Sequence, residues 1–186
     1  EKYMSKTVRI GLIGAGFIGR SHATAYVNQC IFGSDIKVKL VVVADPFEKA
    51  ARELAESHGF ERFTTDWHEV VKAEDVDLVC ICTPNSTHCE IAMEAARNGK
   101  AINCEKPLGM DGDEAEQAAK VIKECNAIAT CGFNTMKIPV VAYAKEVIES
   151  GELGKLVCFR GIYDTDGLAT PDATHAWRML AKNSLL

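Results

Sequence analysis

Three glycines in the spacing G-x-G-x-x-G stand between a short apolar run at residues 8–13 and a helical pattern that begins at Phe17. In a dinucleotide-binding loop the first glycine permits a tight turn and the second lets a pyrophosphate approach the backbone. The third lets the helix pack closely against the strand. The free N–H groups and the positive dipole end of the helix would bind the phosphates. We therefore predict a dinucleotide-binding loop that comprises Gly14, Gly16, Phe17, Ile18 and Gly19.

An acidic residue ends the second apolar run. Asp45 follows Leu40–Ala44, and its carboxylate is suited to accept hydrogen bonds from both hydroxyls of an adenosine ribose. The same charge repels a 2′-phosphate, so Asp45 favours NAD over NADP. The sequence separation between the loop and Asp45 exceeds the usual value of about 20 residues, and an inserted loop at residues 29–37 would account for the excess. An ordinary role as a helix N-cap is the alternative for Asp45.

Polar clusters follow two later apolar runs. One cluster is T-P-N-S-T-H at residues 83–88, and the other is C-E-K-P-L at residues 104–108. Ligands bind outside the carboxyl ends of parallel strands, so both clusters are expected to face the same crevice as the glycine loop.

The elements that must position these residues alternate between strand and helix. Strands are expected at residues 8–13, 40–44, 78–82, 101–104 and 128–132. Helical spacing of apolar residues separates them, and Gly59 and Gly99 stand where helices should end. Asp111 with Glu114 resembles a capping box at the start of another helix. Strands separated by single helices predict a doubly wound parallel sheet, an α/β Rossmann fold.

The pattern changes after Phe133. We expect a helix at Pro139–Gly151 and a long strand at Leu156–Tyr163 that does not fit the preceding alternation. We therefore predict a dinucleotide-binding domain at residues 4–133. Residues 134–186 would begin a second domain, which is either cut short in this sequence or continues in a part that is not given.

Composition excludes several classes of function. The net charge is −5 and there is no run of Lys or Arg, which argues against a nucleic-acid partner. No apolar stretch reaches the length of a membrane span, and no signal peptide is recognisable. Of the eight cysteines, Cys80 and Cys82 share one face of a predicted strand without forming a C-x-x-C pair. We predict reduced thiols, no metal site and a cytoplasmic location.

The order of the motifs resembles the Gfo/Idh/MocA family of oxidoreductases, which includes inositol dehydrogenases and related sugar dehydrogenases. The resemblance is carried by G-A-G-F-I-G, T-P-N-x-x-H, G-K-x-x-x-C-E-K-P-L, G-F-N and W-R between residues 8 and 178. E-K-P placed after T-P-N is far more specific than the glycine motif alone. The resemblance implies that residues 134–186 begin an α+β domain with a large open sheet, which covers the active site, binds substrate and builds oligomer contacts.

The resemblance implies roles for individual residues. It places Lys106 beside the nicotinamide and the reacting hydroxyl, where the ammonium would stabilise a developing alkoxide. It implies that the cofactor is contacted by Thr83, Pro84, Asn85, His88, Glu105, Lys106, Asn134, Trp177 and Arg178. Alternatives are a surface ion pair for Lys106 with Glu105 or another carboxylate, a backbone-bonded helix start for His88, and a core position for Trp177.

The sequence also departs from the family. Met136 and Lys137 stand where many members carry an arginine. The histidine that serves members as general base, in a later D-x-x-x-H segment, has no counterpart among the histidines of this chain, which are His22, His58, His68, His88 and His175.

Two functions follow as hypotheses. The first is an NAD-dependent dehydrogenase that moves a hydride between a sugar or cyclic polyol hydroxyl and nicotinamide, works as a dimer or tetramer at full length, and is inactive as this chain alone. The alternative is a sugar-responsive regulator of the same fold that binds a dinucleotide without chemistry, which has no need of Lys106. A biliverdin- or dihydrodipicolinate-type reductase fits the T-P-N and E-K-P motifs less well.

Overall fold

A parallel sheet forms the centre of the molecule in a computed structural model that describes residues 7–32, 35–162 and 164. The strands are β1 (Thr7–Ile13), β2 (Lys37–Ala44), β3 (Arg62–Thr64), β4 (Leu78–Ile81), β5 (Ala101–Cys104) and β6 (Ala129–Cys131). They pair in the order β3-β2-β1-β4-β5-β6, and every pairing is parallel. The order changes direction at β1, so the loops after β1 and β4 leave the sheet on either side of one crevice.

Helices connect the strands. The α-helices are α1 (Phe17–Asn28), α2 (Glu48–His58), α3 (Trp67–Lys72), α4 (His88–Arg97), α5 (Gly112–Glu124) and α6 (Pro139–Glu149). Short 3₁₀ turns are η1 (Gln29–Phe32), η2 (Asn85–Thr87) and η3 (Asn134–Lys137). This is the predicted doubly wound Rossmann arrangement, and α1 begins at Phe17, as expected.

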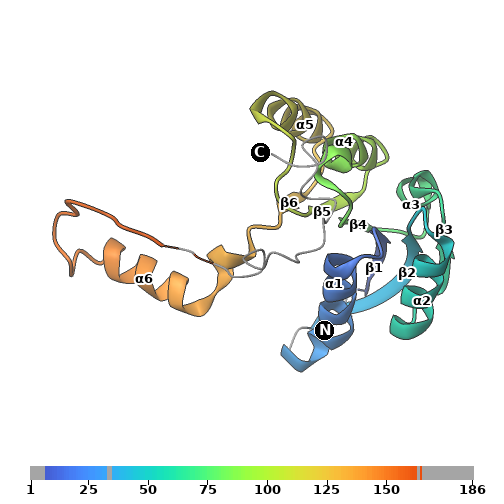
Figure 1. Cartoon of the computed structure of the whole chain (residues 1–186), viewed down its shortest axis with the longest axis horizontal. Coiled ribbons are helices and arrows are strands. Elements are labelled where there is room, and N and C mark those ends of the chain that lie inside the picture. The colour runs from blue at the N-terminus through green and yellow to red at the C-terminus, as the bar shows by residue number, and fades with distance from the viewer. Residues whose placement is uncertain (1–6, 33–34, 163, 165–186) are drawn as a thin grey trace, which may run out of the picture.

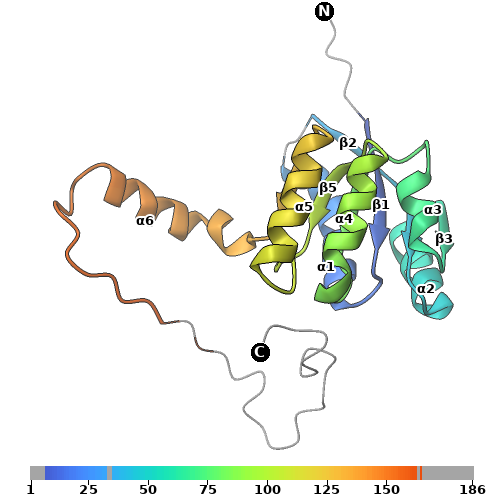
Figure 2. The ribbon, with the colours of Figure 1, turned by 90° about the horizontal axis from the view of Figure 1, so that it is seen from above.

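The core lies in two layers, one on each face of the sheet. Side chains of α3, α4 and α5 pack on one face, where Val70, Ile91 and Ile122 meet residues of β2 and β4. Side chains of α1 and α2, including Ala23 and Leu54, pack on the other face. Figure 2 shows α3, α4 and α5 side by side on one face of the sheet.

Helix α2 ends and helix α5 begins at the residues that the sequence predicted. Gly59 has a φ of 79° and follows α2 directly, so it closes the helix in the left-handed conformation that glycine adopts most easily. The Asp111 carboxylate accepts a hydrogen bond from the Glu114 backbone N–H at 2.8 Å at the start of α5. The Glu114 side chain accepts one from the Met110 N–H at 2.8 Å. The capping interaction expected at Asp111 is therefore present.

Two expectations differ from the structure. The short elements β3 and α3 were not predicted; they occupy the connection between β2 and β4. The long strand expected at Leu156–Tyr163 was wrong over residues 156–162, which form no strand. An isolated strand has no ladder partner for its backbone groups, and no paired strand stands beside this segment among the described residues.

The segment after β6 is exposed. No residue of α6 is buried, and residues 150–162 are exposed as well. Figure 1 shows α6 and the following segment extending away from the sheet. None of the helices in the described part of the chain is long and apolar enough to cross a membrane.

Candidate active site

The glycine loop joins the ends of three strands. Gly14 has a φ of 101°, and its N–H donates to the Ala44 carbonyl at 2.8 Å. A Cβ atom on Gly14 would lie 2.5 Å from the carbonyl oxygen of Cys82, which follows β4. A Cβ atom on Gly19 would overlap the Gly14 carbonyl oxygen. These two glycines are therefore required by the packing of the loop itself.

Gly16 is different, because its surroundings are open. A Cβ atom there would have no heavy atom within 4 Å. Gly16 is also the N-cap of α1, and within the described part of the chain this helix start has no side-chain capping hydrogen bond. Phe17 is 82% exposed beside it, and Ile18 is half-buried. The loop thus presents free backbone N–H groups to open space, an arrangement suited to a phosphate.

Asp45 lies directly against the loop. Its carboxylate accepts hydrogen bonds from the Ala15 N–H at 2.8 Å and from the Phe47 N–H at 2.9 Å. The N-cap of α2 is Phe47, so Asp45 is not the N-cap, which was the alternative. The carboxylate is half-buried at the carboxyl end of β2, within reach of a ligand that lies along the loop.

A small apolar cavity of about 270 Å³ opens beside Asp45. Gly14, Asp45, Trp67 and Thr83 line it from four different segments, together with Ile13, Ala44, Pro46, Thr65, Pro84, Thr87 and Ile91. The apolar walls and the carboxylate at the rim suit a flat ring that carries a ribose. Sequence reasoning missed Trp67 and Thr65, because they come from the unpredicted segment around α3.

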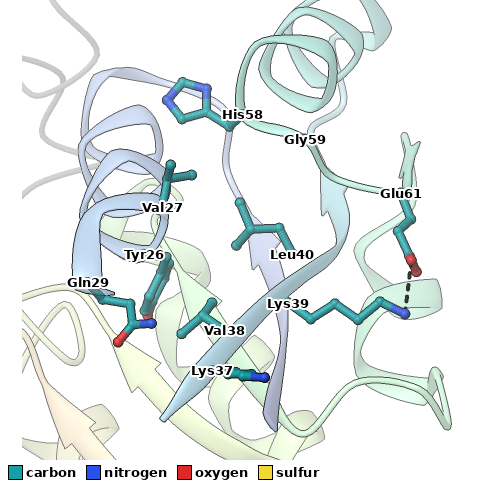
Figure 3. A pocket seen from close by; sticks show the side chains of 10 residues that line it. All are labelled: Tyr26, Val27, Gln29, Lys37, Val38, Lys39, Leu40, His58, Gly59 and Glu61. Carbon is teal, nitrogen blue, oxygen red and sulfur yellow. Dashed lines mark ion pairs between the residues drawn. The ribbon is translucent and has the colours of Figure 1, made fainter. Parts of the chain in front are cut away.

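A wider hollow of about 510 Å³ lies at the opposite end of β2 (Figure 3). Tyr26, Leu40 and His58 line it, and Lys39 pairs with Glu61 across 2.9 Å at its edge. It faces the amino half of β2, whereas ligands of open α/β sheets bind at the carboxyl ends. The smaller cavity is therefore the one whose position in the sheet suits a cofactor.

His88 connects the two polar loops. Its Nδ1 lies 2.7 Å from the Pro107 carbonyl oxygen, and its Nε2 lies 2.9 Å from the Thr83 carbonyl oxygen. The residue is 1% exposed. This is the backbone-bonded alternative considered for His88, and any effect on a cofactor would pass through the two loops. The Thr87 hydroxyl also donates to the Thr83 hydroxyl at 2.7 Å.

Glu105 and Lys106 have contrasting environments although they are neighbours. Glu105 is only 9% exposed, and its carboxylate lies 2.9 Å from His22 Nε2 and accepts a 3.3 Å hydrogen bond from the Lys106 N–H. The Lys106 side chain is exposed, and no ion pair joins its ammonium to a carboxylate in the described ranges. The alternative of an ion pair between Lys106 and Glu105 is therefore not formed.

A compact polar group lies beneath Glu105, on the face of β4 that α1 covers. His22 contacts Cys80 and Glu105, and these two neighbours raise the pKa of His22 to about 9, with Cys80 the larger cause. Hydrogen bonds from Cys82 and His22 lower the pKa of the Cys80 thiol. The neighbouring Cys80 sulfur, and then burial, raise the pKa of Cys82. Sequence reasoning placed Cys80 and Cys82 on one face of a strand but missed the group, because His22 and Glu105 are far from them along the chain.

Some of the remaining predicted site residues lie near the crevice, and two lie outside the described residues. Asn134 is exposed and begins η3, two residues after Gly132, whose Cβ position lies 2.9 Å from the Glu105 carboxylate. Thr83, Pro84 and Asn85 follow β4 at the rim of the crevice. Trp177 and Arg178 lie outside the described residues. Their predicted contacts with a cofactor, like those of the other residues named here, stay predictions.

The fold and the loop define a dinucleotide-binding Rossmann protein, and comparison with known proteins makes the class more specific. The profile of the oxidoreductase family with the NAD-binding Rossmann fold, Gfo/Idh/MocA, matches residues 8–133. The chain belongs to this family.

Individual relatives are dehydrogenases. A levoglucosan dehydrogenase from Pseudarthrobacter phenanthrenivorans is 38% identical over 175 residues, which are 93% of this chain and 45% of that protein. The NAD(+)-dependent scyllo-inositol 2-dehydrogenase of Bacillus subtilis is 36% identical over 164 residues, which are 88% of this chain and 46% of that protein. A structure of levoglucosan dehydrogenase in complex with NADH superposes with a TM-score of 0.92 at 36% identity, covering 96% of this chain and 49% of that one. The chain spans about half the length of the relatives it matches.

Proposed function

We propose that this chain is the cofactor-binding part of an NAD-dependent dehydrogenase that oxidises a secondary hydroxyl of a sugar or cyclic polyol. The observation that carries the proposal is the exposed Lys106 ammonium, which has no ion-pair partner in the described structure and follows β5 at the edge of the sheet that carries the glycine loop. An unpaired ammonium there is available to a substrate oxygen. A regulator that performs no chemistry has no need of it.

The cofactor is proposed to be NAD. It would lie with its pyrophosphate over Gly16, its ribose at Asp45 and its adenine in the cavity lined by Trp67. The Asp45 carboxylate supports NAD over NADP because it repels a 2′-phosphate. The family description and the NADH-bound relative support the same choice. NAD, when bound, supplies the C4 position that accepts the hydride.

The residues of this chain would stabilise the charge on the substrate oxygen and hold the loops of the site in position. Lys106 would donate a hydrogen bond to the substrate oxygen and stabilise the negative charge that develops as the carbinol C–H bond breaks. His88 would keep the loops after β4 and β5 in register through its two carbonyl contacts. The hydroxyl proton would leave to a base that lies outside the described residues.

The compartment, the domain organisation and the substrate class of the enzyme are also part of the proposal. The described cysteine side chains form no disulfide, which supports a reducing compartment such as the cytoplasm. The apolar side chains exposed on α6 support the proposal that residues 134–186 begin a second domain, which would complete the substrate site and form a homo-oligomer. The negative net charge supports a small-molecule substrate rather than a nucleic acid.

The test of the proposal is formation of NADH by a protein of the relatives' length that contains this chain. Levoglucosan and the inositols are the first substrates to try, because the relatives carry those names. We expect Lys106→Ala to lower kcat roughly 100-fold or more, since the oxyanion loses its donor. The Kd for NADH should change less than about threefold, because binding energy resides in the glycine loop.

The matched control is Lys123→Ala, which removes an ammonium from α5. This variant should keep its turnover. Normal turnover in Lys106→Ala would contradict the assigned role of the lysine. NADH binding without turnover of any sugar or polyol would favour the regulator instead.

A further inference from the structure

The polar group beneath Glu105 contains three potential metal ligands from two elements. His22 lies on α1, Cys80 lies on β4, and Cys82 follows the end of β4. Residues two apart in a strand point to the same face, and α1 covers that face. The imidazole nitrogen and the two sulfur atoms consequently all lie within 4.8 Å of one another.

The spacing of the sulfur atoms fits a shared ion better than a covalent bond. Cys80 Sγ and Cys82 Sγ are 3.6 Å apart. A tetrahedral Zn²⁺ with Zn–S bonds of about 2.3 Å separates two sulfur ligands by about 3.8 Å. A disulfide requires about 2.0 Å. Two thiolates and an imidazole are the donors that Zn²⁺ prefers in proteins.

A carboxylate lies beside the imidazole, outside the set of three atoms that approach one another within 4.8 Å. Glu105 Oε1 lies 2.9 Å from His22 Nε2, and Glu105 is almost fully buried. The group is also supported from outside, because Asn103 Nδ2 lies 3.7 Å from Cys80 Sγ and donates to the Tyr26 hydroxyl oxygen at 3.2 Å. Such outer hydrogen bonds orient ligands in metal sites.

We propose that His22, Cys80, Cys82 and Glu105 form a binding site for Zn²⁺ between α1 and the sheet. Binding replaces the His22–Glu105 hydrogen bond with bonds to the ion, and the protons held by the ligating nitrogen and sulfur atoms leave to solvent. Glu105 also accepts the N–H of Lys106, so the ion would be coupled to the loop that carries Lys106. The metal site itself does not depend on the proposed dehydrogenase activity.

The experiment titrates Zn²⁺ into the reduced, metal-stripped 186-residue chain against a chromophoric chelator. We expect one Zn²⁺ per chain and a higher unfolding temperature when the ion is present. Co²⁺ in place of Zn²⁺ should give a sulfur-to-metal charge-transfer band and the intense visible bands of tetrahedral coordination. Octahedral Co²⁺ without that band would overturn the proposal.

Variants separate this site from the other thiols of the chain. Cys80→Ala and His22→Gln should each weaken Zn²⁺ binding more than about 100-fold, because each removes a direct ligand. Cys125→Ala, at an exposed thiol, is the matched control and should bind like the parent chain. Circular dichroism of the metal-free variants checks that they fold. If the variant at the buried Cys80 does not fold, His22→Gln still tests the site.

Three outcomes decide against the proposal or part of it. The site is refuted if the parent chain binds no stoichiometric Zn²⁺. It is also refuted if His22→Gln binds Zn²⁺ as tightly as Cys125→Ala does, since other cysteines would then hold the ion. Unchanged affinity in Glu105→Gln would remove Glu105 from the ligand set.

Discussion

The glycines in the loop after β1 fall into two kinds: those that the packing of the loop requires, and Gly16, whose surroundings are open. Gly19 has no room for a Cβ atom because the Gly14 carbonyl oxygen occupies its position, whereas Gly16 faces open space. Their spacing alone makes them look equivalent, and only the packing distinguishes them.

We predict opposite consequences for alanine at these two positions. Gly19→Ala should lower the free energy of unfolding by about 1–3 kcal/mol, because backbone must move to relieve the overlap. Gly16→Ala should leave the unfolding free energy within about 0.5 kcal/mol. It should nevertheless weaken NADH binding at least tenfold, since a methyl group would lie where the pyrophosphate approaches. Urea unfolding and NADH titration of the two variants measure both effects.

The control is internal, because each variant tests a property that the other should retain. Equal loss of stability in both variants would contradict the division. Undiminished NADH affinity in Gly16→Ala would show that the pyrophosphate does not lie over this residue.

The sequence was sufficient to predict residues whose roles depend on their neighbours along the chain. It did not predict contacts between segments that are distant in the sequence. Gly14, Gly19 and Asp45 could be placed because a strand, a turn and a helix start surround them. The contact between His22 and Glu105 joins residues 83 positions apart. No periodicity or motif within one sequence encodes such a pair, so the polar group beneath Glu105 emerged only from the packing of α1 on β4.

Elements were predicted where they are long enough to show a period. The continuous apolar runs of β2 and β4 and the helical spacing in α2 were sufficient. The elements β3 and α3 have three and six residues, too few to reveal an alternation or a helical face. The strand expected at residues 156–162 failed for a different reason, because a strand is defined by its partners and the described structure offers none there.

One ion pair connects two elements and gives a prediction about acid stability. Arg9 of β1 donates from its backbone N–H and its Nε to the Asp77 carboxylate, each at 2.9 Å, and from Nη2 at 2.6 Å. The hydrogen bond from the Arg9 side chain is the main cause that lowers the pKa of Asp77 below its ordinary value. Both side chains are partly exposed, so solvent screens the pair and its contribution to stability is small.

The lowered pKa fixes the sign of the pH dependence. Stability from an acid whose folded pKa is depressed is fully present above the unfolded pKa of about 3.9, and it is lost as the pH falls through the folded value. Asp77→Asn should therefore be less stable than the parent chain at pH 7, and the difference should shrink below about pH 4. Urea unfolding at several pH values measures it.

Glu116→Gln is the matched control, because it neutralises an exposed carboxylate in the middle of α5 that has no ion pair within the described residues. This variant should follow the parent chain at every pH. A difference between Asp77→Asn and the parent chain that does not vary with pH would contradict the electrostatic explanation.

At the scale of the whole molecule, burial is concentrated in one part of the chain. Both core layers are built from residues between β1 and β6, and the family profile ends at residue 133 as well. The following segment exposes large apolar side chains, with Val157 92% and Phe159 87% exposed. The described structure is thus a Rossmann unit followed by a segment that contributes no buried side chain.

This distribution of burial predicts that the Rossmann unit folds without the segment. A chain that ends at Ile138 and a chain that ends at Ile162 should unfold within about 2 °C of each other, because the 24 additional residues bury nothing against the sheet. Both chains should bind NADH equally, since the glycine loop and Asp45 are common to them.

The longer chain should associate more strongly at high concentration, because Val140, Tyr143 and Phe159 remain exposed. Calorimetry and analytical ultracentrifugation test the two statements separately. An unfolding temperature that falls by many degrees in the shorter chain would mean that α6 packs against the sheet in solution, which the exposure of its side chains contradicts.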